Sequence, residues 1–250
     1  MEVMTRYKAT ISYDGYAFAG FQRQPHARSV QEEIEKTLTR LNKGKAITVH
    51  GAGRTDSGVH ALGQVSNFFI RKDIPVEAIK NQINKNLYGK IKILEIEEVE
   101  NDFNARFDAI KRTYLYIMKK RDDITPFEAD YISGIKNHVN AEILQDIMKV
   151  YIGSHDFSSF MKKDKAARNT VREIYNIKCF GDSVTGETKI EISGSSFLKT
   201  MVRIMVGSAL AVYFHERDRD YILKKLENPD VDGRKILAAP EGLYLYKVDY

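Results

Sequence analysis

The first hundred residues alternate between two hydrophobic periods, one of two residues and one of about 3.6. Residues 7–13 alternate apolar and polar side chains, which predicts a half-buried strand ending at the Asp14-Gly15 turn. Ser29 and Glu32 form a capping box before an apolar stripe, which predicts a helix over 30–41. Strands near 47–50 and 63–70, a helix with Pro75 at its first position and a strand over 91–99 follow. This β-α-β-β-α-β order is typical of a ferredoxin-like unit, also called a split βαβ unit.

The rest of the chain repeats this theme with inserted segments. Residues 112–118 alternate as a strand that places Tyr114 and Tyr116 on one face. Further expected elements are a helix near 143–151, strands near 171–180 and 187–194, helices over 197–214 and 219–227, and a closing strand over 243–248. The pattern therefore predicts an α+β protein of two ferredoxin-like domains, residues 1–105 and 106–250, with inserted helices in the second.

Composition and charge indicate the class of protein and its cellular location more clearly than its activity. With 250 residues and 43% hydrophobic side chains, the chain can bury a real core. The net charge of +5 suits a nucleic-acid partner without requiring one. Cys179 is the single cysteine and lies in an alternating run, so we expect a buried strand thiol and a reducing, cytoplasmic location. No apolar run approaches the roughly 20 residues of a membrane span, and we expect neither a targeting peptide nor a membrane partner.

Motifs for several kinds of chemistry are missing from the sequence. The six histidines show no close ligand spacing and there are no cysteine pairs, so no metal site is predicted. No Gly-Lys-Ser/Thr follows the glycines as in a P-loop, and the glycine-rich stretch does not open a helix as a Rossmann fingerprint would. A hydrolase nucleophile elbow is also missing. A reaction without cofactors that uses one carboxylate remains.

The best candidate for that carboxylate lies between the strands expected near 47–50 and 63–70. Three glycines, at 51, 53 and 58, surround the triplet Arg54-Thr55-Asp56. Glycines at this density permit positive φ angles and the close approach of another backbone. The stretch is either a long turn with a solvated Arg-Asp pair or a loop that holds Asp56 toward a substrate.

Two residues elsewhere could assist Asp56. Arg203 lies in an apolar helical pattern, so it either reaches water along the polar edge or pairs with a carboxylate such as Asp56. Such a pair would favour the ionised carboxylate and fix its direction. Tyr114 is either a core aromatic of its strand or a group that faces the substrate.

Several separated motifs resemble one family. GRTDSGVHA, around Asp56, resembles the GRTDAGVHA catalytic loop of the TruA-type tRNA pseudouridine synthases, with Ser57 where the family often has Ala. Further similar segments, in the family's order, are YDGYAFAGFQRQPHARSVQEEIEKTL, FNARFDAIKRTYLYIM, GSHDFSSF, FLKTMVRIMVG and APEGLYLYKV.

The resemblance implies a pseudouridine synthase fold of two ferredoxin-like domains with a central cleft. It implies isomerisation of uridine to pseudouridine at positions 38, 39 and 40 of the tRNA anticodon arm, without cofactor or metal, by a homodimer. By family position, Asp56 is the catalytic residue, Arg203 orients and charge-stabilises it, and Tyr114 stacks on the uracil. Arg54 would occupy the space left by the flipped nucleotide, and Leu243 would line the uracil pocket.

Two departures and two alternatives stay open. The family often has His at Asn104 and Pro-Asp/Glu-Asp at Tyr88-Gly89-Lys90, which puts the RNA position more in doubt than the chemistry. One alternative is a related synthase that acts on another RNA, such as ribosomal RNA. The other is a non-catalytic RNA-binding module, although the sequence has no RNP1-like run to support it.

Overall fold

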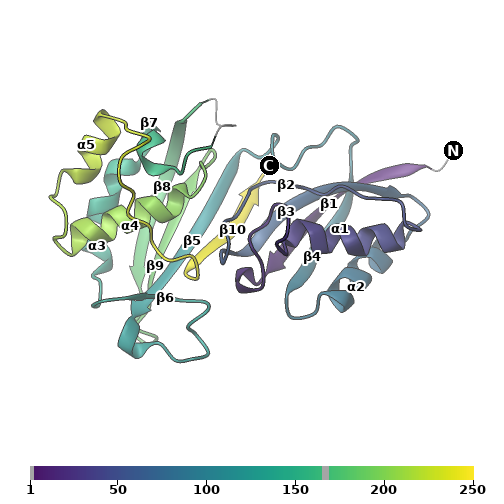
Figure 1. Ribbon diagram of the computed structural model, residues 1–250, viewed down its shortest axis with the longest axis horizontal. Helices are drawn as coiled ribbons and strands as arrows, with labels where there is room; N and C mark the ends of the chain where they lie inside the picture. The colour runs from purple at the N-terminus through teal and green to yellow at the C-terminus, as the bar shows by residue number, and fades with distance from the viewer. Residues whose placement is uncertain (1–2, 165–168) are drawn as a thin grey trace. The chain divides into compact units, whose positions relative to one another are not determined.

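The computed structural model describes residues 3–164 and 169–250 (Figure 1). The chain forms two compact units: unit 1 contains Met1–Ile110 and Leu245–Tyr250, and unit 2 contains Lys111–Tyr244. The expected division at residues 105 and 106 left the whole closing strand in the second half. In the structure the last six residues join unit 1, because they supply a strand to its sheet.

The sheet of unit 1 is built around its first strand. The strands are β1 (Met4–Tyr13), β2 (His50–Gly51), β3 (His60–Arg71), β4 (Ile91–Val99) and β10 (Leu243–Asp249), in the order β4-β1-β3-β10 with β2 also paired to β3. β1 runs antiparallel to both neighbours, with Ala9 opposite Ser66 of β3 and Ile96 of β4. The alternating residues of β1 from Thr5 to Tyr13 are buried, as the two-residue period predicted.

Two helices, α1 (Val30–Leu41) and α2 (Val76–Asn86), pack together over one face of this sheet (Figure 1). Val30, Ile34 and Leu38 are completely buried on α1, which confirms the predicted stripe. The Ser29 hydroxyl accepts the Glu32 backbone N–H at 3.3 Å, as the capping box required. Pro75 caps α2 from the preceding position and is not its first helical residue, because its extended ψ of 139° lies outside the helical range.

The strand expected near residues 47–50 is only partly present. Just His50 and Gly51 pair with β3, opposite Asn67 and Ser66. The backbone N–H and C=O of Val49 bond instead to side chains of α1, so both groups of this residue have hydrogen-bond partners without a neighbouring strand.

The strands of unit 2 pair mainly antiparallel. Its strands are β5 (Lys111–Lys120), β6 (Ser133–Ile135), β7 (Gly153–Asp156), β8 (Val171–Gly181) and β9 (Thr188–Gly194), in the order β5-β9-β8-β7 with β6 parallel to β5. Its helices are α3 (Ala141–Met148), α4 (Met201–Tyr213) and α5 (Tyr221–Glu227). The α3 helix packs on β8 and on α4. Short 3-10 turns cover Gly15–Ala17 in unit 1 and Arg121–Asp123, Lys149–Tyr151 and Ser158–Phe160 in unit 2.

The α4 helix is the apolar centre of unit 2. Ten of its thirteen residues are buried. The helix was expected from residue 197, but it begins at Met201 because Thr200 adopts a left-handed conformation with φ of 65°. A residue in the left-handed region cannot belong to a right-handed helix, so α4 starts at the next residue.

The structure confirms the α+β class and the β-α-β-β-α-β order in unit 1. Among the described residues, no helix is both long and apolar enough to cross a bilayer.

Candidate active site

The candidate carboxylate Asp56 lies in the loop of residues 52–59, which links β2 to β3 in unit 1. Asp56 is half-buried, whereas Arg54 is exposed and its Nη1 lies 3.4 Å from the Gln22 Oε1. The Val59 N–H donates to the Asp56 carbonyl at 3.2 Å, and Gly58 has a φ of 77°. The chain therefore turns tightly just after Asp56, at a position that glycine accommodates best.

The first residues of the loop are hydrogen-bonded to β3. The Ala52 N–H donates to the Val65 carbonyl at 2.8 Å, which extends the β2–β3 ladder by one bond. At Gly53 the Gln64 side chain supplies the hydrogen bonds that a strand would supply. Its Nε2 donates to the Gly53 carbonyl at 2.9 Å and its Oε1 accepts the Gly53 N–H at 3.3 Å. Gln64 is completely buried, so its amide replaces a strand partner for this one peptide.

Both neighbours of Asp56 are held by the end of β1 and by the segment that follows it. The Tyr13 and Thr55 hydroxyls share a hydrogen bond of 2.9 Å, and both residues are buried. The Phe21 N–H donates to the Thr55 carbonyl at 3.3 Å, and the Ser57 hydroxyl lies 3.5 Å from the Phe18 carbonyl. With anchors on each side, the backbone of Asp56 has little freedom to turn, which is the preorganisation a catalytic group needs.

Two glycines make this close contact possible. A Cβ atom on Gly15 would lie 2.2 Å from the Val59 carbonyl oxygen, and one on Gly20 would lie 2.6 Å from the Thr55 carbonyl oxygen. The Gly15 N–H donates to Nδ1 of His60 at 3.0 Å, and His60 is almost fully buried. Nδ1 is therefore an acceptor here, and a proton on the neutral ring lies on Nε2.

The remaining candidates belong to unit 2. Tyr114 on β5 is mostly buried and meets the Phe197 ring edge-to-face, with centroids 5.0 Å apart. Leu243 opens β10, is buried, and donates its N–H to the Pro240 carbonyl at 2.9 Å.

Arg203 is fixed in place by the segment before β10. Its Nε donates to the Ala238 carbonyl at 2.9 Å, and the Ala238 N–H donates back to the Arg203 carbonyl at 2.9 Å. The side chain is partly exposed, and its charge lowers the pKa of Tyr116, although burial dominates and raises that pKa well above its usual value.

The structure thus brings Asp56 and Arg54 together on one loop, and it places Tyr114, Arg203 and Leu243 in unit 2. The sequence reasoning missed the residues that hold the loop, among them Tyr13, Gln64 and His60. Gln64 could have been noticed as a polar side chain within the apolar run of β3, but its partner Gly53 could not. Within residues 3–164 and 169–250, no group of three His, Cys, Asp or Glu side chains could hold a metal ion.

The family model and the most similar sequences agree on one family. The family model described as tRNA pseudouridine synthase matches residues 9–108 and 147–250. A tRNA pseudouridine synthase A from Streptococcus pneumoniae strain P1031 is 44% identical over 247 residues, covering 99% of both chains. The protein of the same name from strain 70585 is 43% identical over the same length and coverage. Among solved structures, a Cbf5-Nop10-Gar1 complex shares 11% identity with a TM-score of 0.38, covering 82% of this chain and 44% of that one.

Proposed function

Because the chain belongs to the tRNA pseudouridine synthase family, we propose that it isomerises uridine to pseudouridine in tRNA with Asp56 as the catalytic carboxylate. The observation that carries this assignment is the loop geometry. Asp56 is half-buried, and its neighbours Thr55 and Ser57 are hydrogen-bonded to the end of β1 and to the segment after it. A solvated Arg-Asp turn would not need such anchoring.

The reaction conserves atoms and electrons. The N1–C1′ bond of uridine breaks, the uracil turns, and C5 bonds to C1′. N1 ends with a proton and C5 loses one, so the base exchanges protons with its surroundings and no other reactant is consumed. A carboxylate suits this chemistry as a nucleophile or as a base toward the nucleotide. Reaching C1′ in a stem requires the nucleotide to be flipped out, at a cost of a few kcal/mol.

We assign supporting roles to the other candidates. Arg203 would pair with Asp56 and keep it ionised; its Nε bond to Ala238 fixes the plane in which the guanidinium donates. Tyr114 would stack on the uracil and help remove the C5 proton, and Leu243 would line the pocket around the base. Arg54, which is exposed, would fill the space left by the flipped nucleotide.

The finer substrate and assembly are also proposed from the family resemblance. We propose uridines 38, 39 and 40 of the anticodon arm as targets, a homodimer as the working form, and the cytoplasm as the location. Phosphate contacts would come from the dispersed Lys and Arg side chains, so tRNA binding should weaken as salt is raised.

The test follows the C5 proton. An anticodon-arm tRNA transcript with tritium at uracil C5 is incubated with the purified protein, and tritium released to water is counted. We expect release by the wild type, none by Asp56→Ala, and tRNA binding by the variant within a few-fold of the wild type. Substantial release by Asp56→Ala would remove Asp56 from the catalytic role. Binding without release by the wild type would point to a different RNA target.

A further inference from the structure

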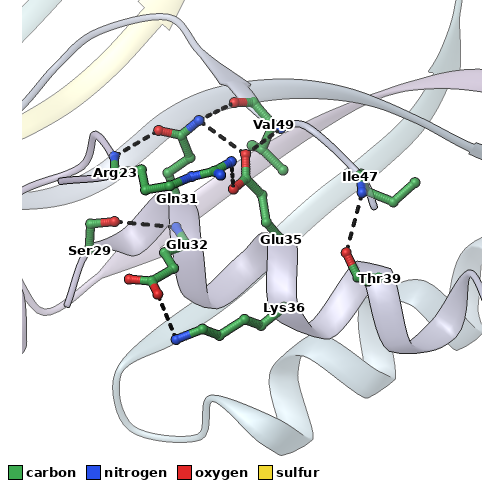
Figure 2. A network of polar contacts seen from close by, with 9 residues as sticks. All are labelled: Arg23, Ser29, Gln31, Glu32, Glu35, Lys36, Thr39, Ile47 and Val49. Atoms are coloured by element: carbon green, nitrogen blue, oxygen red, sulfur yellow. Dashed lines mark hydrogen bonds and ion pairs between the residues drawn. The ribbon is translucent and has the colours of Figure 1, made fainter. Parts of the chain in front are cut away.

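The peptide of Val49, at the entrance to the Asp56 loop, is held by two side chains of α1 (Figure 2). The Val49 N–H donates to the Glu35 Oε1 at 2.9 Å, and the Gln31 Nε2 donates to the Val49 carbonyl at 3.0 Å. Both backbone polar groups of Val49, its N–H and its C=O, are therefore hydrogen-bonded to side chains of the helix. A strand partner would use the same two bonds, so the helix takes the place of a neighbouring strand.

The two side chains are themselves linked and closed off. The Gln31 Nε2 also donates to the Glu35 Oε1 at 3.1 Å, and the Gln31 Oε1 accepts the Arg23 N–H at 2.8 Å. The Arg23 guanidinium pairs with the second oxygen of Glu35, whose side chain is only 7% exposed. We call Arg23, Gln31 and Glu35 the loop clamp. Every polar atom of the two α1 side chains in it has a partner (Figure 2).

A buried carboxylate is an expensive way to hold one peptide, because removing its charge from water costs more than neutral hydrogen bonds return. A neutral side chain would be sufficient to hold a loop that has no functional role. What a charged acceptor adds is a shorter, stronger and more directional bond. The presence of Glu35 at this position therefore calls for a reason beyond folding.

The clamp reaches Asp56 along two routes. Along the chain, Val49 leads into the β2 pair, then to Gly53 held by Gln64, and then to Asp56. Through space, the Gln31 N–H donates to the Phe21 carbonyl at 2.9 Å, and the Phe21 N–H donates to the Thr55 carbonyl, next to Asp56. Both ends of the segment 49–55 are therefore connected by hydrogen bonds to α1. Val49 is connected through the side chains of Gln31 and Glu35, and Thr55 is connected through Phe21.

We propose that Glu35, acting through Gln31 and Val49, is a positioning residue that sets the placement of Asp56. The proposal rests on the proposed function, since it assigns Asp56 the chemistry. A shift of about 1 Å in a reacting group reduces turnover by up to about 100-fold, while tRNA binding is spread over many contacts. Loss of the clamp should therefore lower kcat and leave KM nearly unchanged.

The experiment compares Glu35→Ala and Glu35→Gln, with Glu33→Ala as the matched control. The glutamine keeps an oxygen to accept the Val49 N–H, whereas alanine does not. Glu33 lies on the same helix and pairs with Arg28 and Lys36, away from the loop. Tritium release gives kcat and KM at a temperature well below every variant's Tm. Amide hydrogen exchange of residues 49–56 reports on the loop without any need for turnover.

We expect kcat to fall at least 10-fold in Glu35→Ala with KM within about 3-fold, and amide exchange of residues 49–56 to accelerate. Glu35→Gln keeps one acceptor oxygen but loses the charge and the pair with Arg23, so its kcat should lie between those of the wild type and Glu35→Ala, whereas Glu33→Ala should match the wild type. Wild-type kcat in a folded Glu35→Ala, unchanged exchange, or an equal loss in Glu33→Ala would overturn the proposal. If Glu35→Ala does not fold, Gln31→Ala, which removes the donor to the Val49 carbonyl, is judged by the same criteria. Turnover by Asp56→Ala would overturn the catalytic assignment, while the exchange result would still decide whether the clamp holds the loop.

Discussion

Glycine at position 20 shows how a single residue sets the spacing around the candidate carboxylate. Its φ of 102° is unfavourable for residues with a Cβ, and a Cβ there would lie 2.6 Å from the Thr55 carbonyl oxygen. The sequence shows this glycine within the motif GFQ, but the reason for it appears only when residues 20 and 55 are in contact. At the scale of single residues, the sequence therefore shows which residue is present, but the contact that explains its presence is seen only in the tertiary structure.

We expect Gly20→Ala to destabilise the protein more than Gly44→Ala. Both glycines have positive φ, so both variants carry about 1 kcal/mol of backbone strain, but at Gly44 no atom of the residues that the structure describes lies within 4 Å of the position that a Cβ would take. The clash at Gly20 should add about 1–3 kcal/mol. Urea unfolding of the two variants measures the difference, and equal losses would show that the contact with Thr55 has no energetic weight.

Cys179 should be unreactive in the native protein. Burial raises the pKa of its thiol to about 12, so at pH 8 only about one thiol in ten thousand is ionised. In the unfolded chain, with an ordinary pKa of about 8.5, a sizeable fraction is ionised. We expect iodoacetamide to react at least about 100-fold more slowly with native than with guanidinium-unfolded protein at pH 8. Comparable rates would mean that the thiol is accessible and that burial does not control its ionisation.

At the scale of elements, the α1 helix and the β3 strand do more than their hydrophobic patterns predict. Their apolar positions form the core as expected. In addition, polar side chains, namely Gln31 and Glu35 on α1 and Gln64 on β3, bond to the backbone of Val49 and Gly53, as a neighbouring strand would. This explains why the strand expected near residues 47–50 shortens to His50–Gly51. Periodicity reports which face of an element is buried, not which backbone its polar residues satisfy.

Gln64→Leu tests this use of a side chain as a strand partner. The variant keeps the approximate shape but removes both bonds to Gly53, which we expect to cost about 1–3 kcal/mol. Gln82→Leu on α2, whose amide bonds only to nearby Asn86, is the control and should stay within about 0.5 kcal/mol of the wild type. Free energies of unfolding from urea titrations make the comparison. A Gln64→Leu value equal to the control's would show that Gly53 is equally well satisfied by water.

At the scale of the whole molecule, the chain returns to the unit in which it began. Leu245–Tyr250 belong to unit 1, where the Ile110 N–H donates to the Asp249 carbonyl at 2.9 Å and the Tyr250 hydroxyl donates to the Ala105 carbonyl at 2.7 Å. A division of the chain into two contiguous domains does not include this return of the last residues to unit 1. Unit 1 is therefore complete only when the last residues of the chain are in place.

Leu245→Ala should weaken unit 1 although the residue lies far along the chain from the rest of that unit. Leu245 is completely buried, so the variant should lose about 2–5 kcal/mol, whereas the neighbouring Tyr246 is 45% exposed and Tyr246→Ala serves as the control. Amide exchange in β3 is the sensitive readout, since β3 is the strand next to β10 in unit 1. Faster exchange confined to unit 2 would contradict the assignment of this residue to unit 1.

The sequence by itself determined most elements of both units, though not the short strands β6 and β7, together with the apolar faces of α1 and β1, the loop around Asp56 and the family to which the chain belongs. These follow from patterns within about ten residues and from motifs, which local sequence carries directly. The tertiary structure alone decided the shortened strand at Val49, the late start of α4 after Thr200, the placement of the last residues in unit 1, and the clamp from Glu35. Apart from the start of α4, which follows the conformation of Thr200, each of these depends on which backbone or side chain meets a residue distant in sequence, and hydrophobic periodicity does not indicate such partners.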